Sequence, residues 1–197
     1  FTAVIALGLV AMKVSELAII KPSFYAISVG FWLVALRWVT NFPDSATVWA
    51  RNSLLVPVGV ILLIPAWAGL VDLYHASPWW LMYVFALVWG ADSGAYFAGR
   101  AFGKHKLAPN VSPGKTIEGF VGGVLTTAVL IIAVAVYREL SAVRLMAFLG
   151  LSLLTVLASV LGDLLESMIK RQAGVKDSGN IFPGHGGALD RIDSLTA

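Results

Sequence analysis

The sequence has no cysteine, and it has few charged residues for its length. Without cysteine these residues can form no disulfide, offer no thiolate nucleophile and bind no zinc through thiolates. Only 13% of the 197 residues are charged, whereas a soluble domain usually carries about 25%. Because 58% of the residues are hydrophobic, a single water-surrounded core is too small to bury them. We therefore expect the lipid bilayer to surround most of the chain.

Apolar runs long enough to cross a bilayer recur along the sequence. A membrane-spanning helix needs roughly 20 apolar residues. Five runs approach this length: 23–40, 54–71, 79–98, 119–137 and 145–165. A shorter run at 1–12 is typical of the remnant of another helix. The expected fold class is all-α, a polytopic transmembrane helical bundle, and we expect 1–197 to be a single domain cut at both ends from a longer protein.

Small residues indicate where two of these helices touch. Gly119, Gly122 and Gly123 lie at the start of the run 119–137. Glycine has no side chain to separate two helix backbones, so it is common where membrane helices pack closely. We predict that this helix lies tightly against a neighbouring helix.

The connecting loops differ in charge, and this difference predicts an orientation. Four basic residues lie in 99–118 and four in 166–193, whereas 72–78 contains no lysine or arginine. Cytoplasmic loops carry an excess of lysine and arginine. The two basic stretches are therefore predicted to be cytoplasmic, together with the loop near 41–53. Two helices separate the basic stretches, so they can share one side of the membrane.

Charged residues are concentrated in these same parts of the chain. Of the 25 charged residues, 15 lie in 92–118 and 163–193. Asp163, Glu166 and Lys170 are spaced by three and four positions, so they share one face of a helix. An acid such as Asp163 at the end of a long apolar run is unfavourable unless it is paired, hydrated or bound to a metal. These two stretches are the expected location of a functional site.

The stretch 163–193 has the composition of a phosphoryl-transfer site. Asp190 and Asp193 are three positions apart, and three glycines surround His185. Glycine-rich turns let backbone amides approach phosphate oxygens, and carboxylates can hold magnesium beside a substrate phosphate. Each piece also has a simpler interpretation, as a surface salt bridge or an ordinary turn. The concentration of acids, bases and glycines in one stretch favours a site.

The stretch 92–118 offers a second group of polar residues. Asp92 is an acid close to a membrane boundary, and Ser112, Lys115 and Thr116 could bind an anionic ligand. Residues 114–116 read Gly-Lys-Thr, as in a P-loop, but Pro109 occupies the position of the first glycine, and we expect no strand before it. The alternative role for the basic residues is attraction to anionic lipid head groups.

The run from Ser167 to Asp193 resembles the signature of the bacterial phosphatidate cytidylyltransferases, also called CDP-diacylglycerol synthases. The matching positions are Ser167, Lys170, Arg171, Lys176, Asp177, Gly179, Gly184, His185, Gly186, Gly187, Asp190, Arg191 and Asp193. The segments 92–100 and 112–119 are also similar to that family, as is the order of apolar runs. The resemblance implies that CTP and phosphatidic acid are converted to CDP-diacylglycerol and pyrophosphate in phospholipid biosynthesis.

The resemblance also implies roles for individual residues. Magnesium, with a second cation left open, would be held by Asp163, Glu166, Asp190 and Asp193. The catalytic residues would be Asp163, Lys170, Arg171, His185, Asp190, Arg191 and Asp193. Substrate would be bound by Ser112, Lys115, Thr116, Glu118, Ser167, Lys176, Asp177, Gly186 and Gly187.

The expected setting is the cytoplasmic (inner) membrane of a bacterium, with several spans and with the active site facing the cytoplasm. The expected partners are CTP, phosphatidic acid and the lipid bilayer, without nucleic acid, and a homodimer is left open. One alternative is another membrane nucleotidyl- or phosphotransferase that acts on a lipid phosphate. A transporter would also place charges in membrane helices, but transporters often have two matching halves, and the sequence contains no internal repeat.

Overall fold

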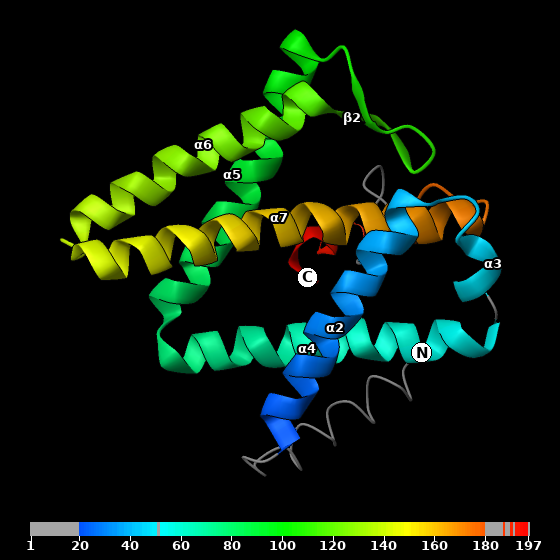
Figure 1. Ribbon diagram of the computed structural model, residues 1–197, viewed down its shortest axis with the longest axis horizontal. Helices are drawn as coiled ribbons and strands as arrows, with labels where there is room; N and C mark the ends of the chain where they lie inside the picture. The colour runs from blue at the N-terminus through cyan, green and yellow to red at the C-terminus, as the bar shows by residue number, and fades with distance from the viewer. Residues whose placement is uncertain (1–19, 51, 180–186, 188–189, 191, 197) are drawn as a thin grey trace.

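The computed structural model describes residues 20–50, 52–179, 187, 190 and 192–196, and long helices dominate these parts (Figure 1). The α-helices, in chain order, are α2 (Ile20–Thr40), α3 (Ala46–Trp49), α4 (Asn52–Ala76), α5 (Pro78–Phe102), α6 (Ile117–Tyr137) and α7 (Ala142–Gln172). The short elements are β1 (Lys106–Ala108), β2 (Ser112–Thr116) and the 3-10 helix η2 (Asp193–Leu195). The all-α class is therefore confirmed, and the predicted run 1–12 lies outside the described residues.

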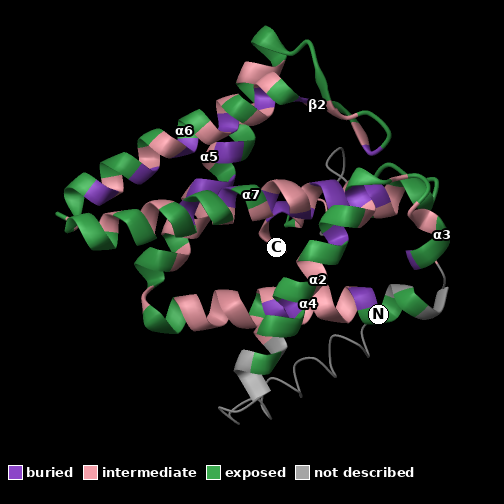
Figure 2. Ribbon diagram, in the orientation of Figure 1, coloured by how far each residue is buried: buried purple, intermediate pink, exposed green. Residues whose placement is uncertain are grey.

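Within the described part of the chain, four helices are long and apolar enough to cross a membrane. They are Val56–Ala76, Pro78–Phe102, Ile117–Tyr137 and Ala142–Gln172, and Tyr25–Thr40 is a shorter apolar helix. Many residues of these helices are exposed (Figure 2), and they include large apolar ones such as Val129 and Val136 on α6. In water this exposure would be unfavourable, but in lipid an apolar side chain is well accommodated. The prediction of a multi-pass helical bundle is confirmed.

Helix α7 continues further than its apolar sequence suggested. It runs to Gln172, seven residues past the predicted end at 165. Two features stabilise these additional turns of α7. Lys170 forms an ion pair with Glu166 one turn earlier. Lys170 and Arg171 also lie at the C-terminal, negative end of the helix dipole. The polar residues after Asp163 thus continue the helix instead of starting a loop.

Helices α5 and α6 pack on each other more extensively than any other pair of described elements. Glycines make this approach possible. A Cβ atom on Gly123 would lie 2.6 Å from the carbonyl oxygen of Ala91, and one on Gly119 would lie 2.8 Å from that of Ala95. Both distances are too short for a methyl group, so these positions require glycine. The predicted close packing of the 119–137 helix is confirmed.

A two-stranded antiparallel hairpin joins α5 to α6. The expectation of no strand before Lys115 is therefore wrong, because strands of three and five residues are too short to show a reliable alternation in the sequence. The Glu118 carboxylate fixes the base of the hairpin by accepting hydrogen bonds from the backbone amides of Lys104 (3.0 Å) and His105 (3.2 Å). The Glu118 carboxylate also contacts Nδ1 of His105 at 2.6 Å.

The hairpin, the loop between α2 and α4 and the C-terminal end of α7 lie toward the same end of the molecule (Figure 1). The α4–α5 and α6–α7 junctions lie toward the opposite end. A buried apolar cluster joins the first group. It consists of Ala35, Val39, Trp49, Val111, Leu164, Leu165 and Met168. The described residues 99–118 and 166–179 of the two basic stretches thus lie toward one end of the bundle, as their charge predicted.

Candidate active site

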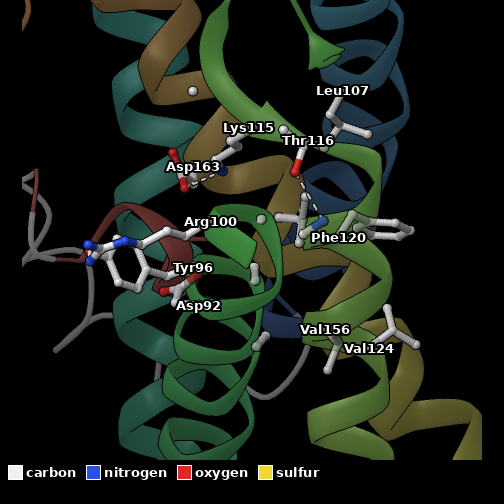
Figure 3. A pocket seen from close by; sticks show the side chains of 17 residues that line it. Asp92, Tyr96, Arg100, Leu107, Lys115, Thr116, Phe120, Val124, Val156 and Asp163 are labelled. Carbon is white, nitrogen blue, oxygen red and sulfur yellow. Dashed lines mark hydrogen bonds and ion pairs between the residues drawn. The ribbon is translucent and has the colours of Figure 1, made fainter. Parts of the chain in front are cut away.

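A cavity of about 420 Å³ lies where α5, α6, α7 and the hairpin meet (Figure 3). Its polar lining consists of Asp92, Tyr96, Arg100, Lys115, Thr116 and Asp163. Its apolar lining includes Leu107, Phe120, Val124, Val156 and Val160. The cavity thus brings together residues from both of the charged stretches that the sequence singled out.

The junction between β2 and α6 positions Lys115. Thr116 is the N-cap of α6, and its side-chain oxygen accepts a hydrogen bond from the backbone amide of Gly119 at 3.1 Å. Thr116 is itself buried. Lys115 directly precedes this capped residue, and its side chain lines the cavity.

Lys115 forms an ion pair with Asp163 (Figure 3). Its Nζ contacts Oδ2 of the carboxylate, and the hydroxyl of Ser167 donates to Oδ1 at 3.3 Å. The two charged side chains are only 27% and 21% exposed. Partial shielding from water strengthens such a pair relative to one on an open surface. Of the residues predicted for the site, Lys115, Thr116, Asp163 and Ser167 are therefore close together.

A second ion-pair group lies further along α7. Nζ of Lys170 contacts Glu166 at 2.8 Å and Asp190 at 2.7 Å. The other oxygen of Asp190 accepts hydrogen bonds from the amide and hydroxyl of Ser178 and from the amide of Gly187. Partial burial opposes ionisation, but these donors together with Lys170 lower the pKa of Asp190. The ionised Asp190 carboxylate thus connects Lys170 of α7 with Ser178 and Gly187.

The helix η2 carries one further acid, Asp193, and contacts Asp92 of the cavity through Ser194. The hydroxyl of Ser194 donates to Asp92 at 3.2 Å across 102 residues of sequence, and its amide donates to Asp193 at 2.8 Å. Burial raises the pKa of Asp193, and the nearby Asp163 carboxylate raises it further. The sequence analysis left the role of Asp92 open, and the structure places it in the lining of the cavity.

Other predicted residues lie elsewhere. Nε of Arg171 donates to the carbonyl of Val111 in the hairpin, and Glu118 holds the base of that hairpin. Ser112 lies in β2 but does not line the cavity, and Lys176 and Asp177 are exposed. Three predicted residues lie outside the described part of the chain: His185, Gly186 and Arg191.

Sequence reasoning missed Tyr96, Arg100, Ser178 and Ser194. A signal for the first two was present, because Asp92, Tyr96 and Arg100 follow one another at intervals of four and so share a helix face. In the structure Arg100 donates to the hydroxyl of Tyr96 at 3.3 Å, and both line the cavity. No comparable spacing points to the two serines.

The acids of this region suit a hard divalent cation. Five carboxylates interact here with two lysine ammonium groups: Asp92, Asp163, Glu166, Asp190 and Asp193 with Lys115 and Lys170. Oε1 of Glu166 is buried and has no hydrogen-bond partner in the described part of the chain. No three acidic or histidine side chains among the described residues form a metal cage. Magnesium often takes only one or two carboxylates together with water and substrate phosphates, so the donor set fits this ion.

An apolar groove of about 800 Å³ adjoins the polar cavity. It lies between α2 and α7 and reaches the hairpin, and it shares Leu107, Phe120 and Val160 with the cavity. Its walls include Trp32 and Leu36 of α2 and Leu157, Ala158 and Leu161 of α7. None of the described residues that line the groove is charged. A polar site and an apolar groove thus share a wall.

Comparison with known proteins identifies the family of the chain. The chain matches the family described as "Cytidylyltransferase family" over residues 1–197. It is 50% identical over 183 residues to the phosphatidate cytidylyltransferase of Haemophilus influenzae, covering 86% of this chain and 63% of the relative. It is 46% identical over 169 residues to that of Pseudomonas aeruginosa, covering 85% and 62%. With that of Bacillus subtilis it shares 42% identity over 161 residues, covering 76% and 58%. The chain therefore spans about 60% of the length of these relatives.

Proposed function

Because this chain belongs to the cytidylyltransferase family, we propose that the complete protein transfers a cytidylyl group from CTP to phosphatidic acid. The products are CDP-diacylglycerol and pyrophosphate, and the reaction is a step of phospholipid biosynthesis. The names of the bacterial relatives support this assignment. We place the protein in the bacterial cytoplasmic membrane with its polar cavity toward the cytoplasm, because the basic loops lie at that end of the bundle.

The main support for this function is that the polar cavity and the apolar groove lie side by side and share lining residues. A phosphatidic acid molecule has an anionic phosphate next to two hydrocarbon tails. The cavity offers Lys115 and Arg100 to an anion, and the groove offers an uncharged surface to the tails. A nucleotide alone would need no such groove.

The reaction joins two phosphates. An oxygen of the lipid phosphate attacks the α-phosphorus of CTP, a new P–O bond forms, and the bond to the β-phosphate oxygen breaks so that pyrophosphate leaves. A phosphate monoester is already an anion near neutral pH, so a strong general base is not needed. Positioning of the two anions and neutralisation of their charge should therefore dominate the acceleration.

The residues of the cavity suit these two tasks. The ammonium group of Lys115 would attract phosphate oxygens as a compact positive charge. The guanidinium group of Arg100 could donate two hydrogen bonds to one phosphate. Asp163 and Asp92 would hold magnesium, with Ser167 orienting Asp163 through the hydrogen bond to Oδ1. Magnesium bound there would supply positive charge beside the transferring phosphorus. Lys170 and Asp190 would hold the segment after α7 against the cavity.

The proposal can be tested with full-length protein in detergent micelles, using labelled CTP and phosphatidic acid with magnesium or with EDTA. The informative variant is Asp163→Ala, and the matched control is Asp44→Ala, because Asp44 is an exposed acid in the α2–α3 loop. We expect labelled CDP-diacylglycerol only with magnesium, a loss of product in Asp163→Ala and full activity in Asp44→Ala. Folded full-length protein that makes no lipid product from CTP would contradict the assignment.

A further inference from the structure

The ion pair between Lys115 and Asp163 occupies the carboxylate that the proposed reaction needs for a metal ion. Oδ2 of Asp163 contacts the Lys115 ammonium, and Oδ1 accepts from Ser167. Both oxygens are therefore engaged by protein groups. A divalent cation can use Oδ2 only if the ammonium of Lys115 moves away from it.

The charges around this pair favour such a replacement. Asp92 and Asp193 both interact electrostatically with Asp163, and Lys115 also acts on Asp92. Lys115 thus faces two carboxylates, Asp163 and Asp92, whereas the ammonium that acts on Asp193 is that of Lys170. A divalent cation would neutralise the two carboxylates that Lys115 faces, while Lys115 remained in the cavity as the charge partner of an incoming anion.

The local geometry allows the lysine to move without a change in fold. The Thr116 cap fixes the backbone next to Lys115, and the lysine side chain itself is partly exposed to the cavity. Rotation about its side-chain bonds can carry the ammonium from Asp163 into the 420 Å³ space shared with Arg100. Arg100 contacts the hydroxyl of Tyr96 rather than a carboxylate in the described part of the chain.

We propose that Lys115 is an exchangeable counter-ion of Asp163, which a divalent cation displaces and which then pairs with a phosphate of the bound nucleotide. The second half of this proposal rests on the proposed function, and the first half does not. Lys115 first controls when Asp163 is available to the cation and afterwards contacts the nucleotide phosphate. The protein would therefore bind a divalent cation weakly by itself and more tightly when an anionic substrate is present to receive Lys115.

The test measures metal binding without any substrate. Full-length protein in detergent is titrated with Mn²⁺, and the free ion is followed by its electron paramagnetic resonance signal. The variants are Lys115→Met, which removes the competing charge, and Lys115→Arg, which keeps it. The matched control is Arg100→Met, because it removes a positive charge from the same cavity without freeing a carboxylate.

We expect Lys115→Met to bind Mn²⁺ about tenfold more tightly than the wild type, because the direct competitor at Oδ2 is gone. Lys115→Arg should stay within about twofold of the wild type, and Arg100→Met should gain much less than Lys115→Met. If Arg100→Met gained as much Mn²⁺ affinity as Lys115→Met, the gain would come only from the loss of a positive charge in the cavity. That result would overturn the proposed exchange at Asp163. Unchanged or weaker binding in Lys115→Met also overturns it.

The outcome does not depend on the reaction. Mn²⁺ affinity is measured without CTP or lipid, so a failure of cytidylyl transfer leaves the result for Asp163 and Lys115 interpretable. Each variant is first compared with the wild type by size-exclusion chromatography and thermal unfolding. Lys115 is not part of a buried apolar cluster, so its replacement by methionine should leave the fold intact. The unfolding temperature should fall less than in Lys170→Met, because the Lys115–Asp163 pair is more exposed than the pairs of Lys170.

Discussion

Arg171, in the last turn of α7, donates from Nε to the backbone carbonyl of Val111, 60 residues earlier, at 3.2 Å. Val111 is fully buried in the cluster that joins α2, α3 and α7. The strand that carries Lys115 begins at the next residue, Ser112. The end of α7 thus sets the position of the hairpin, and through it the position of a cavity residue.

Arg171→Ala should loosen the hairpin. The buried carbonyl of Val111 would lose a charged donor, and we expect a loss of roughly 1 to 2 kcal/mol in unfolding free energy. Because Lys115 follows shortly after Val111, the KM for CTP should rise as well. Thermal unfolding and steady-state kinetics of the full-length protein measure the two effects. Arg144→Ala, which changes an exposed arginine at the opposite end of α7, is the control and should change neither.

Gly123→Ala should destabilise the bundle, because its methyl group would meet the carbonyl oxygen of Ala91 in the facing helix. Overpacking of this kind typically costs about 1 to 3 kcal/mol. Gly150→Ala is the matched control, since a Cβ atom there meets open space and alanine favours a helix. Unfolding in a graded mixture of detergents compares the two. Equal stability of the two variants would contradict the close packing of α5 on α6.

Lys170→Met should be strongly destabilising. Its removal leaves the carboxylates of Glu166 and Asp190 without their shared ammonium, and these side chains are only 13% and 10% exposed. Breaking a buried ion pair typically costs about 3 to 5 kcal/mol. Lys170→Arg should recover part of the stability because the charge is kept. The exposed Lys176 provides the control, and Lys176→Met should unfold at the wild-type temperature.

Ala158→Trp should interfere with long-chain lipid substrates. The indole would fill part of the groove between α2 and α7, so we expect the KM for dioleoyl phosphatidic acid to rise about tenfold. The KM for a dihexanoyl substrate and that for CTP should change little. Val129→Trp adds the same side chain to an exposed position on α6 that is outside the groove. An equal effect of both variants, or of Ala158→Trp on both lipids, would argue against the groove as the tail site.

The sequence predicted the helices well because their apolar runs are long and the bilayer imposes a minimum length on them. It also predicted that Lys115, Thr116 and Asp163 belong to one site. The hairpin could not be predicted, because its strands are short and Glu118, rather than a repeating pattern, holds its base. The pairings within the site were equally hidden, since Lys115 with Asp163 and Ser194 with Asp92 depend on how α5, α7 and η2 cross in space.

Residues inside one helix were easier to place than residues joined by tertiary contacts. Glu166 and Lys170 pair at a spacing of four, as the sequence suggested. Asp190 reaches the same lysine across 20 residues, and no spacing in the sequence indicated that contact. The magnesium assignment and the roles of the predicted site residues stay predictions that the experiments above address.

The length of α7 links the chemistry to the thickness of the membrane. At about 1.5 Å per residue its 31 residues span about 46 Å, whereas the hydrocarbon core of a bilayer is about 30 Å thick. Asp163 lies about 32 Å along the helix axis from Ala142. With Ala142 at one edge of the hydrocarbon core and α7 along the membrane normal, Asp163 would lie close to the opposite edge. A thicker bilayer would cover this level with hydrocarbon, and a thinner one would leave it in water. Hydrophobic mismatch would then set the rate at which the protein meets its lipid, with no change in any residue.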